Sequence, residues 1–301
     1  MSELWTLEVN IFTMILVGAV VKRLGIVGRE GQKNITDLVL YVILPCNIFN
    51  SFMTKLTTDM ATECLWVLGI STGIQILAVL YGKIAFRKYP EDEKCNMAYA
   101  MICSNAGFLG NPVAEGVFGL TGMMLGSIYL IPQRIMMWSE GLAIYTGESD
   151  KKAAFKKVIT HPCVIACILG LFFMITGITV PNMILEPVKT LAKCNTAMSM
   201  LVIGLILGEI DPQKLVDKTI MLFTLHRLVI LPLIVYIICL ILPVSKVVTG
   251  VSVLLAAMPA GATTSMLASK YERSPEFATR LVIFSTLCSI PAIVLWTMIL
   301  N

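Results

Sequence analysis

The chain has 301 residues, of which 57% are hydrophobic and only 14% are charged. A soluble domain carries about 25% charged residues, so the composition excludes an ordinary soluble protein and indicates an integral membrane protein. The net charge of +4 gives no reason to expect nucleic acid as a partner. The nine cysteines and two histidines form no recognisable motif, so we predict no metal site, no catalytic site and no enzyme.

Ten apolar stretches follow one another along the chain, and each is near the length of about 20 residues that crosses a bilayer as a helix. In chain order they cover residues 5–21, 36–54, 63–82, 95–118, 122–146, 160–176, 184–208, 216–242, 247–269 and 277–300. We therefore expect an all-α integral membrane protein with ten transmembrane helices.

Basic residues in the loops orient these spans. Lys and Arg collect in the loops on the cytoplasmic side of a membrane. If the N-terminus lies outside, most of the 23 Lys and Arg fall in inner loops, whereas Lys55, Lys189, Lys193 and Lys246 fall outside and two lie within spans. We expect a multi-pass protein of the cell (plasma) membrane, with both termini on the non-cytoplasmic side.

The two halves of the chain share short motifs in the same order. The Cys-Asn pair at 46–47 in span 2 matches 194–195 in span 7, and the Ala-Gly pair at 106–107 in span 4 matches 260–261 in span 9. Because each half holds five spans, the second half enters the membrane from the opposite side, as in the inverted repeats of secondary transporters. We expect repeats at 1–147 and 160–301 joined by a cytoplasmic linker at 148–159, with a scaffold domain and a transport domain each built from both repeats.

Spans 4 and 9 both contain residues that interrupt helices. S-N-A-G-F-L-G-N-P occupies 104–112, and A-A-M-P-A-G-A-T-T-S-M occupies 256–266. Proline and glycine disfavour a helix interior, and freed backbone groups survive in a bilayer only where they line a cavity. Simple kinks are the alternative, but interruptions in corresponding places predict two broken, crossing helices around a transport site. The residues expected to shape this crossing are Gly107, Gly110, Pro112, Pro259 and Gly261.

The chemistry of such a crossing favours an anion. Half-helix N-termini carry partial positive charge and N–H groups without an intrahelical acceptor. Small residues let an anion approach these groups, and neighbouring amides and hydroxyls add further hydrogen bonds. We therefore predict that a small carboxylate binds at Asn47, Asn105, Asn111, Gln133, Arg134, Pro259, Thr263 and Thr264.

Several polar residues within the spans allow two interpretations, a functional role or a structural contact. A charged residue inside a membrane usually has a function, but it can also form an ion pair that only stabilises the fold. Arg134 either contacts substrate or gate, or pairs with Glu140. Asn47 and its counterpart Asn195 either face the site or bond between helices. Glu115 either pairs or carries a proton. Arg227 in span 8 either acts as a structural anchor or has a functional role.

The two interrupted segments, together with L-P-C-N-I-F in span 2 at 44–49, resemble the auxin efflux carrier family, and the resemblance covers nearly the whole chain. It implies a fold like that of the bile-acid sodium symporters, with a scaffold domain and a transport domain that contains two crossing broken helices. It also implies a carboxylate held by Asn105, although the Pro-Asn pair of the plant carriers is Ser104-Asn105 here. Pro259 matches the proline of the second crossing, and Gln133 falls where some plant carriers have a site glutamine. The long cytosolic loop of many plant members is absent, as in a compact prokaryotic carrier.

The leading interpretation is a secondary transporter that moves a small organic anion by alternating access. An anion channel and an ion-independent uniporter are the alternatives. The partners expected are a small organic acid and membrane lipid, and a homodimer is a further arrangement to test. No cofactor is expected beyond a coupling ion, which could be Na⁺ or H⁺. No P-loop for ATP and no enzyme constellation is present in the sequence.

Overall fold

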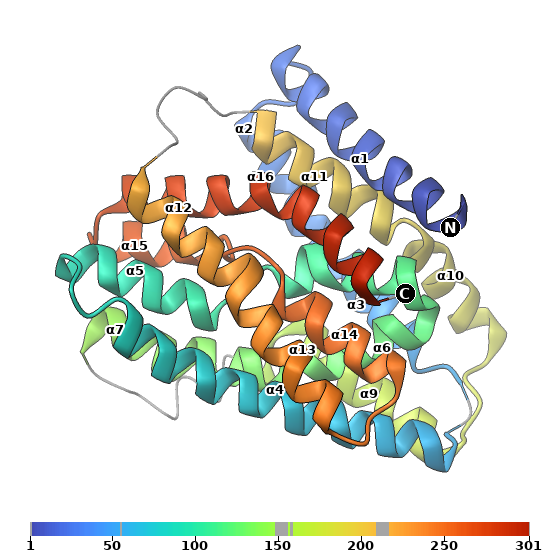
Figure 1. Cartoon of the computed structure of the whole chain (residues 1–301). Helices are drawn as coiled ribbons and strands as arrows, with labels where there is room; N and C mark the ends of the chain where they lie inside the picture. Colours follow the sequence, from blue (N-terminus) through green and yellow to red (C-terminus); the bar gives the residue numbers. More distant parts are fainter. Residues whose placement is uncertain (1, 55, 148–155, 157–158, 209–216, 301) are drawn as a thin grey trace.

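The computed structural model describes residues 2–54, 56–147, 156, 159–208 and 217–300, and these form helices joined by short connections (Figure 1). The first half contains α1 (Ser2–Arg23), α2 (Arg29–Leu38), η1 (Val39–Ile43), α3 (Leu44–Ser51), α4 (Thr58–Ala85), α5 (Glu91–Ile102), η2 (Ala106–Gly110), α6 (Asn111–Trp138) and α7 (Glu140–Thr146). The second half contains α9 (Pro162–Thr176), α10 (Asn182–Lys193), α11 (Asn195–Gly208), α12 (Lys218–Leu225), η4 (His226–Ile230), α13 (Leu231–Ile241), α14 (Lys246–Ala256), α15 (Thr263–Lys270) and α16 (Pro275–Leu300). The η segments are π-helical turns, and the described residues include no β-strand beyond one isolated bridge.

Five helical stretches in the described part of the chain are long and apolar enough to cross a membrane, fewer than the ten predicted. They run over Thr58–Ala85, Ala106–Thr146, Asn182–Gly208, Lys218–Ile241 and Pro275–Leu300. Interruptions shorten other apolar helices, such as Pro162–Thr176 and Lys246–Ala256. The chain is therefore an all-helical, multi-pass membrane protein.

The stretch Ala106–Thr146 has 41 residues, more than one crossing of a bilayer needs. Gly119 divides it, because its backbone has φ 64° and ψ −156° inside α6. This left-handed φ is open to glycine but disfavoured for other residues. The division falls between predicted spans 4 and 5, so α6 contributes residues to both.

Capping side chains set where several helices begin. Thr57 accepts a hydrogen bond from the Met60 amide ahead of α4, and Ser245 accepts one from the Val248 amide ahead of α14. Asp217 does the same for Thr219 at the start of α12. Each cap satisfies one of the N–H groups that a first helical turn leaves without a partner.

The helices pack in two groups. The first, which we name the α1 bundle, consists of α1, α2, η1, α3, α9, α10 and α11, and the second, the α6 bundle, consists of α4, α5, η2, α6, α7, η4 and α12 to α16. Each bundle contains residues from both halves of the sequence. The bundles meet chiefly where α6 and η2 contact α3, α9 and α11.

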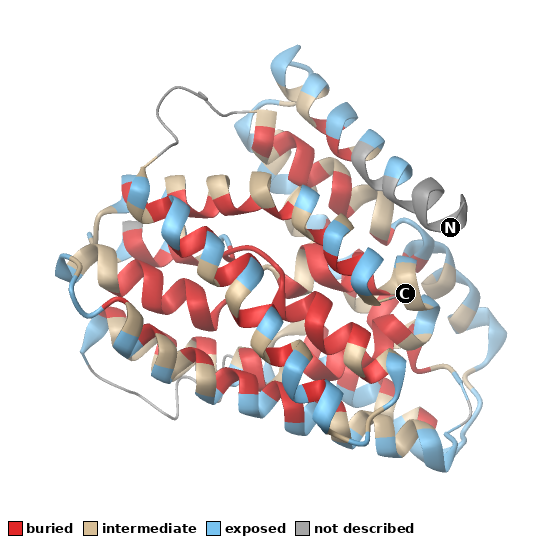
Figure 2. Cartoon of the chain, in the orientation of Figure 1, coloured by how far each residue is buried: buried red, intermediate tan, exposed pale blue. Residues whose placement is uncertain are grey.

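Burial is concentrated in the α6 bundle (Figure 2). α5 is buried from Cys95 to Ile102, and α14 is buried from Gly250 to Ala256. The long helix α4 exposes Leu65, Ile76 and other apolar side chains on its outer face, as a helix facing lipid does. α5 and α14 are the two helices that end at the interruptions, so the interruptions lie inside the protein and away from lipid.

In the α1 bundle, α1 and α11 approach closely through two glycines. Gly18 and Gly204 face each other, and a Cβ on Gly204 would collide with the Ile15 carbonyl oxygen and the Gly18 Cα. Small residues allow this close approach between membrane helices.

We expect Gly204→Ala to destabilise the protein by about 1–3 kcal/mol, because an added methyl group has no room there. Thermal unfolding of the purified protein in detergent measures the change. Gly73→Ala is the matched control, since a Cβ at Gly73 on α4 meets nothing within 4 Å. Equal stability of the two variants would contradict the packing described.

Candidate functional site

Two helix interruptions lie against each other in the α6 bundle. The first separates α5 from η2 at residues 103–105, and the second separates α14 from α15 at residues 257–262. Ser104 and Ala260 form an antiparallel bridge. The Asn105 amide donates to the Pro259 carbonyl at 2.8 Å, and the Gly261 amide donates to the Cys103 carbonyl at 2.8 Å. We refer to these two short extended segments together as the paired breaks.

This pairing provides the hydrogen bonds that backbone groups need inside a membrane. A buried peptide group without a hydrogen bond costs several kcal/mol in an apolar medium. Each break leaves such groups free, and each supplies the donor and the acceptor that the other lacks. Gly261 permits the approach, since a Cβ there would lie 3.0 Å from the Cys103 sulfur and 3.1 Å from its carbonyl oxygen.

Arg227 lies in η4, near the middle of predicted span 8, and binds the C-terminal ends of α5 and α14, the two helices that lead into the paired breaks. Its Nε donates to the Met258 carbonyl at 2.9 Å, and its Nη1 donates to the Met101 carbonyl at 3.1 Å. Only 2% of Arg227 is exposed. Helix C-termini carry partial negative charge, so one buried guanidinium stabilises the ends of α5 and α14 together. This places Arg227 in the anchoring role considered from the sequence.

Two further side chains hold the paired breaks. Gln133 on α6 donates through Nε2 to the Ser104 carbonyl at 2.8 Å and accepts from the Ser104 hydroxyl at 3.0 Å. On the other break, the Ala260 amide donates to the Ser285 hydroxyl of α16 at 3.2 Å. Gln133 is therefore engaged with the backbone of the first break, and its contact with a substrate stays a prediction.

Arg134 lies beside the first break and is half-buried. Its guanidinium packs next to Gly107, and its Nη1 is 3.4 Å from Nδ1 of His161 at the start of α9. The predicted alternative, a pair with Glu140, is wrong. Glu140 instead pairs with Lys83 of α4 at 2.8 Å, because the chain turns at Ser139 before α7 begins. The positive charge of Arg134 is thus left near the start of η2.

Asn105 and Pro259 lie at the centre of the paired breaks. Their backbones bond to each other, as described above. The Asn105 side chain is half-buried and makes no hydrogen bond within the described part of the chain. Its amide group is therefore available to a ligand, close to the start of η2.

The remaining predicted residues lie around the paired breaks or one step further out. Thr263, at the start of α15, contacts the Cys103 sulfur at 2.9 Å, while the Thr264 hydroxyl is buried without a partner among the described residues. Asn111 begins α6 and is fully buried, and neither polar atom of its side chain has a hydrogen-bond partner among the residues that the structure describes. Pro112 follows in the first turn of α6, where proline is tolerated, and Gly110 packs against Leu255 and Met258.

Asn47 lies on α3, outside the paired breaks. Its Nδ2 donates to Oε2 of Glu115 on α6 at 2.7 Å. This contact joins the α1 bundle to the α6 bundle. A role for Asn47 in substrate binding stays a prediction.

Sequence reasoning overlooked three residues of this region. His161, Ser285 and Cys103 contact Arg134, Ala260 and Thr263 respectively. No local pattern marks them, because each contact joins elements that are distant in the sequence. The breaks themselves are visible as Gly, Pro and Asn, whereas the groups that support them are not.

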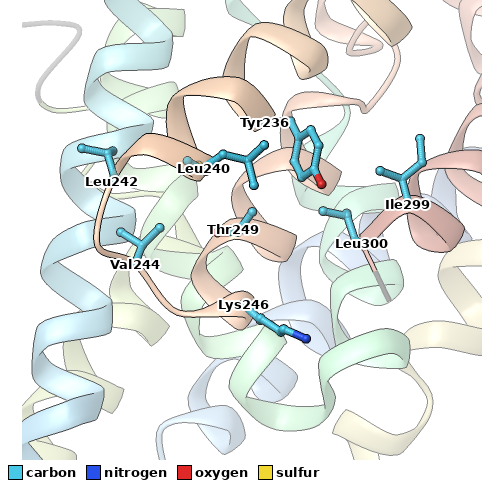
Figure 3. A pocket seen from close by; sticks show the side chains of 9 residues that line it. Tyr236, Leu240, Leu242, Val244, Lys246, Thr249, Ile299 and Leu300 are labelled. Carbon is cyan, nitrogen blue, oxygen red and sulfur yellow. The ribbon is translucent and has the colours of Figure 1, made fainter.

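Cavities elsewhere in the protein lie apart from the paired breaks. One of about 350 Å³ lies where α13 and α16 end and α14 begins, and Figure 3 shows Tyr236, Lys246 and Thr249 among mainly apolar side chains around it. Another of about 310 Å³ lies between α3 and the α9–α10 connection. Neither includes a predicted site residue.

Paired interruptions inside a multi-pass helical protein are typical of membrane carriers. A sequence model described as membrane transport protein matches this chain over residues 5–158 and 149–297. The chain therefore belongs to this family of membrane transport proteins, the auxin efflux carrier family.

Two curated relatives are similar along almost their entire length. An uncharacterized transporter of Methanothermobacter thermautotrophicus is 25% identical over 299 residues, which cover 97% of this chain and 96% of the relative. An uncharacterized transporter of Methanocaldococcus jannaschii is 24% identical over 306 residues, which cover 96% of each chain.

We expect Arg227→Met to lower stability strongly, because it leaves the Met101 and Met258 carbonyls buried without donors. Each unsatisfied group costs about 1–3 kcal/mol. Arg134→Met is the matched control, since the half-buried Arg134 bonds to no backbone carbonyl in the described residues. Thermal unfolding in detergent compares them, and a similar loss in both variants would contradict the anchoring role.

Proposed function

We propose that this membrane transport protein is a secondary transporter that binds a small organic anion, a carboxylate, at the paired breaks. The observation that carries the proposal is the side-chain amide of Asn105, which makes no hydrogen bond within the described residues and lies next to the start of η2, close to Arg134. The first N–H groups of a helix lack intrahelical acceptors and carry partial positive charge. Together with a guanidinium, which binds carboxylates in a forked geometry, they favour an anion over a cation.

The role of each group follows from its surroundings. Asn105 donates to the carboxylate, and Arg134 supplies the compensating charge. Gln133 stabilises the first break through its bond to Ser104, and Arg227 stabilises the helix ends at both breaks through its bonds to Met101 and Met258. Thr263 and Thr264 add hydroxyls at the start of α15.

The mechanism proposed is alternating access. The two bundles meet along α6 and η2, which also follow the first break. If the α1 bundle is a scaffold and the α6 bundle carries the substrate, movement at this interface exposes the site to each side in turn. Each bundle draws on both halves of the chain, which supports the proposed plan of ten helices in two inverted repeats.

The distribution of Lys and Arg supports the orientation, with both termini on the non-cytoplasmic side of the cell membrane. Lys189 and Lys193, counted as outer, lie on α10 at the beginning of the span Asn182–Gly208. Ion-pairing of Lys189 with Glu186 at 2.9 Å reduces its contribution to the charge of that side.

Two measurements test the function and identify the substrate class. Thermal-shift screening of the purified protein against dicarboxylates, keto acids and aromatic acids, with and without Na⁺, should show stabilisation by one class. Counterflow in liposomes should then be saturable and carry no ion current. A sustained current without saturation would favour the anion channel, and failure of every carboxylate to bind would overturn the proposal.

We expect Asn105→Ala to weaken carboxylate binding about 10- to 100-fold, because a hydrogen bond to a charged group contributes about 1.5–3 kcal/mol. Folding should be preserved, since the Asn105 side chain bonds to no other described group. Asn182→Ala, at an exposed asparagine that begins α10, is the control for uptake. Normal uptake by Asn105→Ala would remove Asn105 from the site.

We expect Pro259→Ala to reduce transport by allowing α14 to continue further toward α15. The variant keeps the Pro259 carbonyl that accepts from Asn105 but adds an N–H group within the break. Initial uptake rates measured beside those of Pro187→Ala, a proline inside α10, separate this effect from a general loss of proline. Equal rates in the two variants would show that the break does not depend on Pro259.

A further inference from the structure

A carboxylate lies at the contact between the two bundles and outside the paired breaks. Glu115 is on α6, one turn after Asn111, and is half-buried. Its Oε2 accepts from Asn47 Nδ2 of α3 at 2.7 Å. Glu140 has Lys83 as an ion-pair partner, whereas Glu115 has no basic partner among the described residues.

A second amide, that of Asn195 on α11, lies beside the same carboxylate. Asn195 is fully buried, and its Oδ1 has no hydrogen-bond partner in the described part of the chain. Ser199, one turn further along α11, is also fully buried with an unpartnered hydroxyl. Unsatisfied buried polar groups are rare in proteins and call for an explanation, such as an unoccupied site or a second arrangement.

The three residues Glu115, Asn47 and Asn195 form what we name the amide–acid cluster. Asn47 and Asn195 belong to the α1 bundle and occupy matching positions in the two halves of the sequence. Glu115 belongs to the α6 bundle. The cluster therefore joins the two parts that must move relative to each other.

No described charged group faces Glu115 from the elements that pack on α6. α3 contributes the neutral Cys46 next to Asn47, α11 contains no ionisable residue, and α9 contributes the thiols Cys163 and Cys167 near its start. On α4 and α14 the charged residues lie near helix ends, and Arg134 lies beyond the kink at Gly119. α1, α5 and α7 also contact α6: the described charged side chains of α1 lie in its last turn, and those of α5 and α7 lie near the starts of these helices. A carboxylate without a basic partner is costly within a bilayer, so an ion from solution that neutralises Glu115 would lower this cost.

We propose that Glu115 is the coupling site of this transporter and that its ligand is a proton. This inference rests on the proposed function for its role in transport. A proton from water adds to a Glu115 carboxylate oxygen on one side of the membrane and returns to water on the other. The neutral acid lets α6 move past α3 and α11, while the ionised acid keeps its bond to Asn47.

The geometry favours a proton over Na⁺. Asn47 presents its N–H group to the carboxylate, and an N–H donor repels a metal cation. A metal ion would need several oxygen ligands turned toward it, whereas one proton on a carboxylate oxygen completes the cluster. The free Oδ1 of Asn195 can accept from the protonated acid.

Infrared difference spectroscopy of the protein in lipid tests the site without any substrate. As the pH rises, the wild type should lose a band of the protonated carboxyl group, and Glu115→Gln should lack this band. Glu140→Gln is the matched control and should keep it. An unchanged titrating band in Glu115→Gln would overturn the proposal, and so would loss of the wild-type band on adding Na⁺ at constant pH.

A second variant keeps the test decisive if Glu115→Gln does not fold. Asn47→Leu removes a donor that stabilises the ionised acid, so the midpoint of the band should move to higher pH by about 1–2 pH units. An unmoved midpoint would contradict the amide–acid cluster.

Carboxylate uptake into liposomes under a pH gradient links the cluster to transport. Glu115→Gln should still exchange carboxylate across the membrane, but its uptake should not respond to the pH gradient. A response equal to that of the wild type would also overturn the proposal, whereas failure of all carboxylates to bind would affect only the proposed function.

Discussion

Inside a bilayer a peptide group has no water to bond to, and the hydrogen bonds between the two breaks meet this constraint. The backbone amides of Asn105 and Gly261 donate to the carbonyls of Pro259 and Cys103 respectively, so each interrupted helix supplies hydrogen-bond partners for the other. Arg227 then offsets the negative ends of α5 and α14. Irregular backbone can exist at this depth because all of these groups are bonded within the protein.

The same arrangement links the site to the rest of the molecule. α6 begins just after the first break, carries Gln133 and Arg134 back to it, and meets α3 and α11 of the other bundle. α6 therefore connects the paired breaks to the contact between the bundles. Glu115 lies on that element, and its contact with Asn47 crosses the contact between the bundles.

Much of this architecture could be predicted from sequence because helix breakers act locally. Pro259, Gly261 and the 104–112 segment mark the breaks, and apolar stretches mark the membrane helices. The supporting bonds could not be predicted, since Arg227 reaches Met101 and Met258 across large sequence separations. Glu140 was assigned the wrong partner because the turn at Ser139 redirects it toward Lys83. The plan of ten membrane helices stays a prediction, because apolar composition does not show where a helix ends and interruptions shorten several of the apolar helices.

The bridge between Ser104 and Ala260 is built from main-chain atoms. Its strength therefore does not depend on which side chains occupy these positions, provided that they fit. Substitutions at Ser104 and Ala260 that fit the space would leave these main-chain bonds in place, although a change at Ser104 would remove its side-chain bond to Gln133. Under the proposed function, exchange of a few side chains around the bridge would change which substrate is preferred, while the main-chain joint that positions them stays the same.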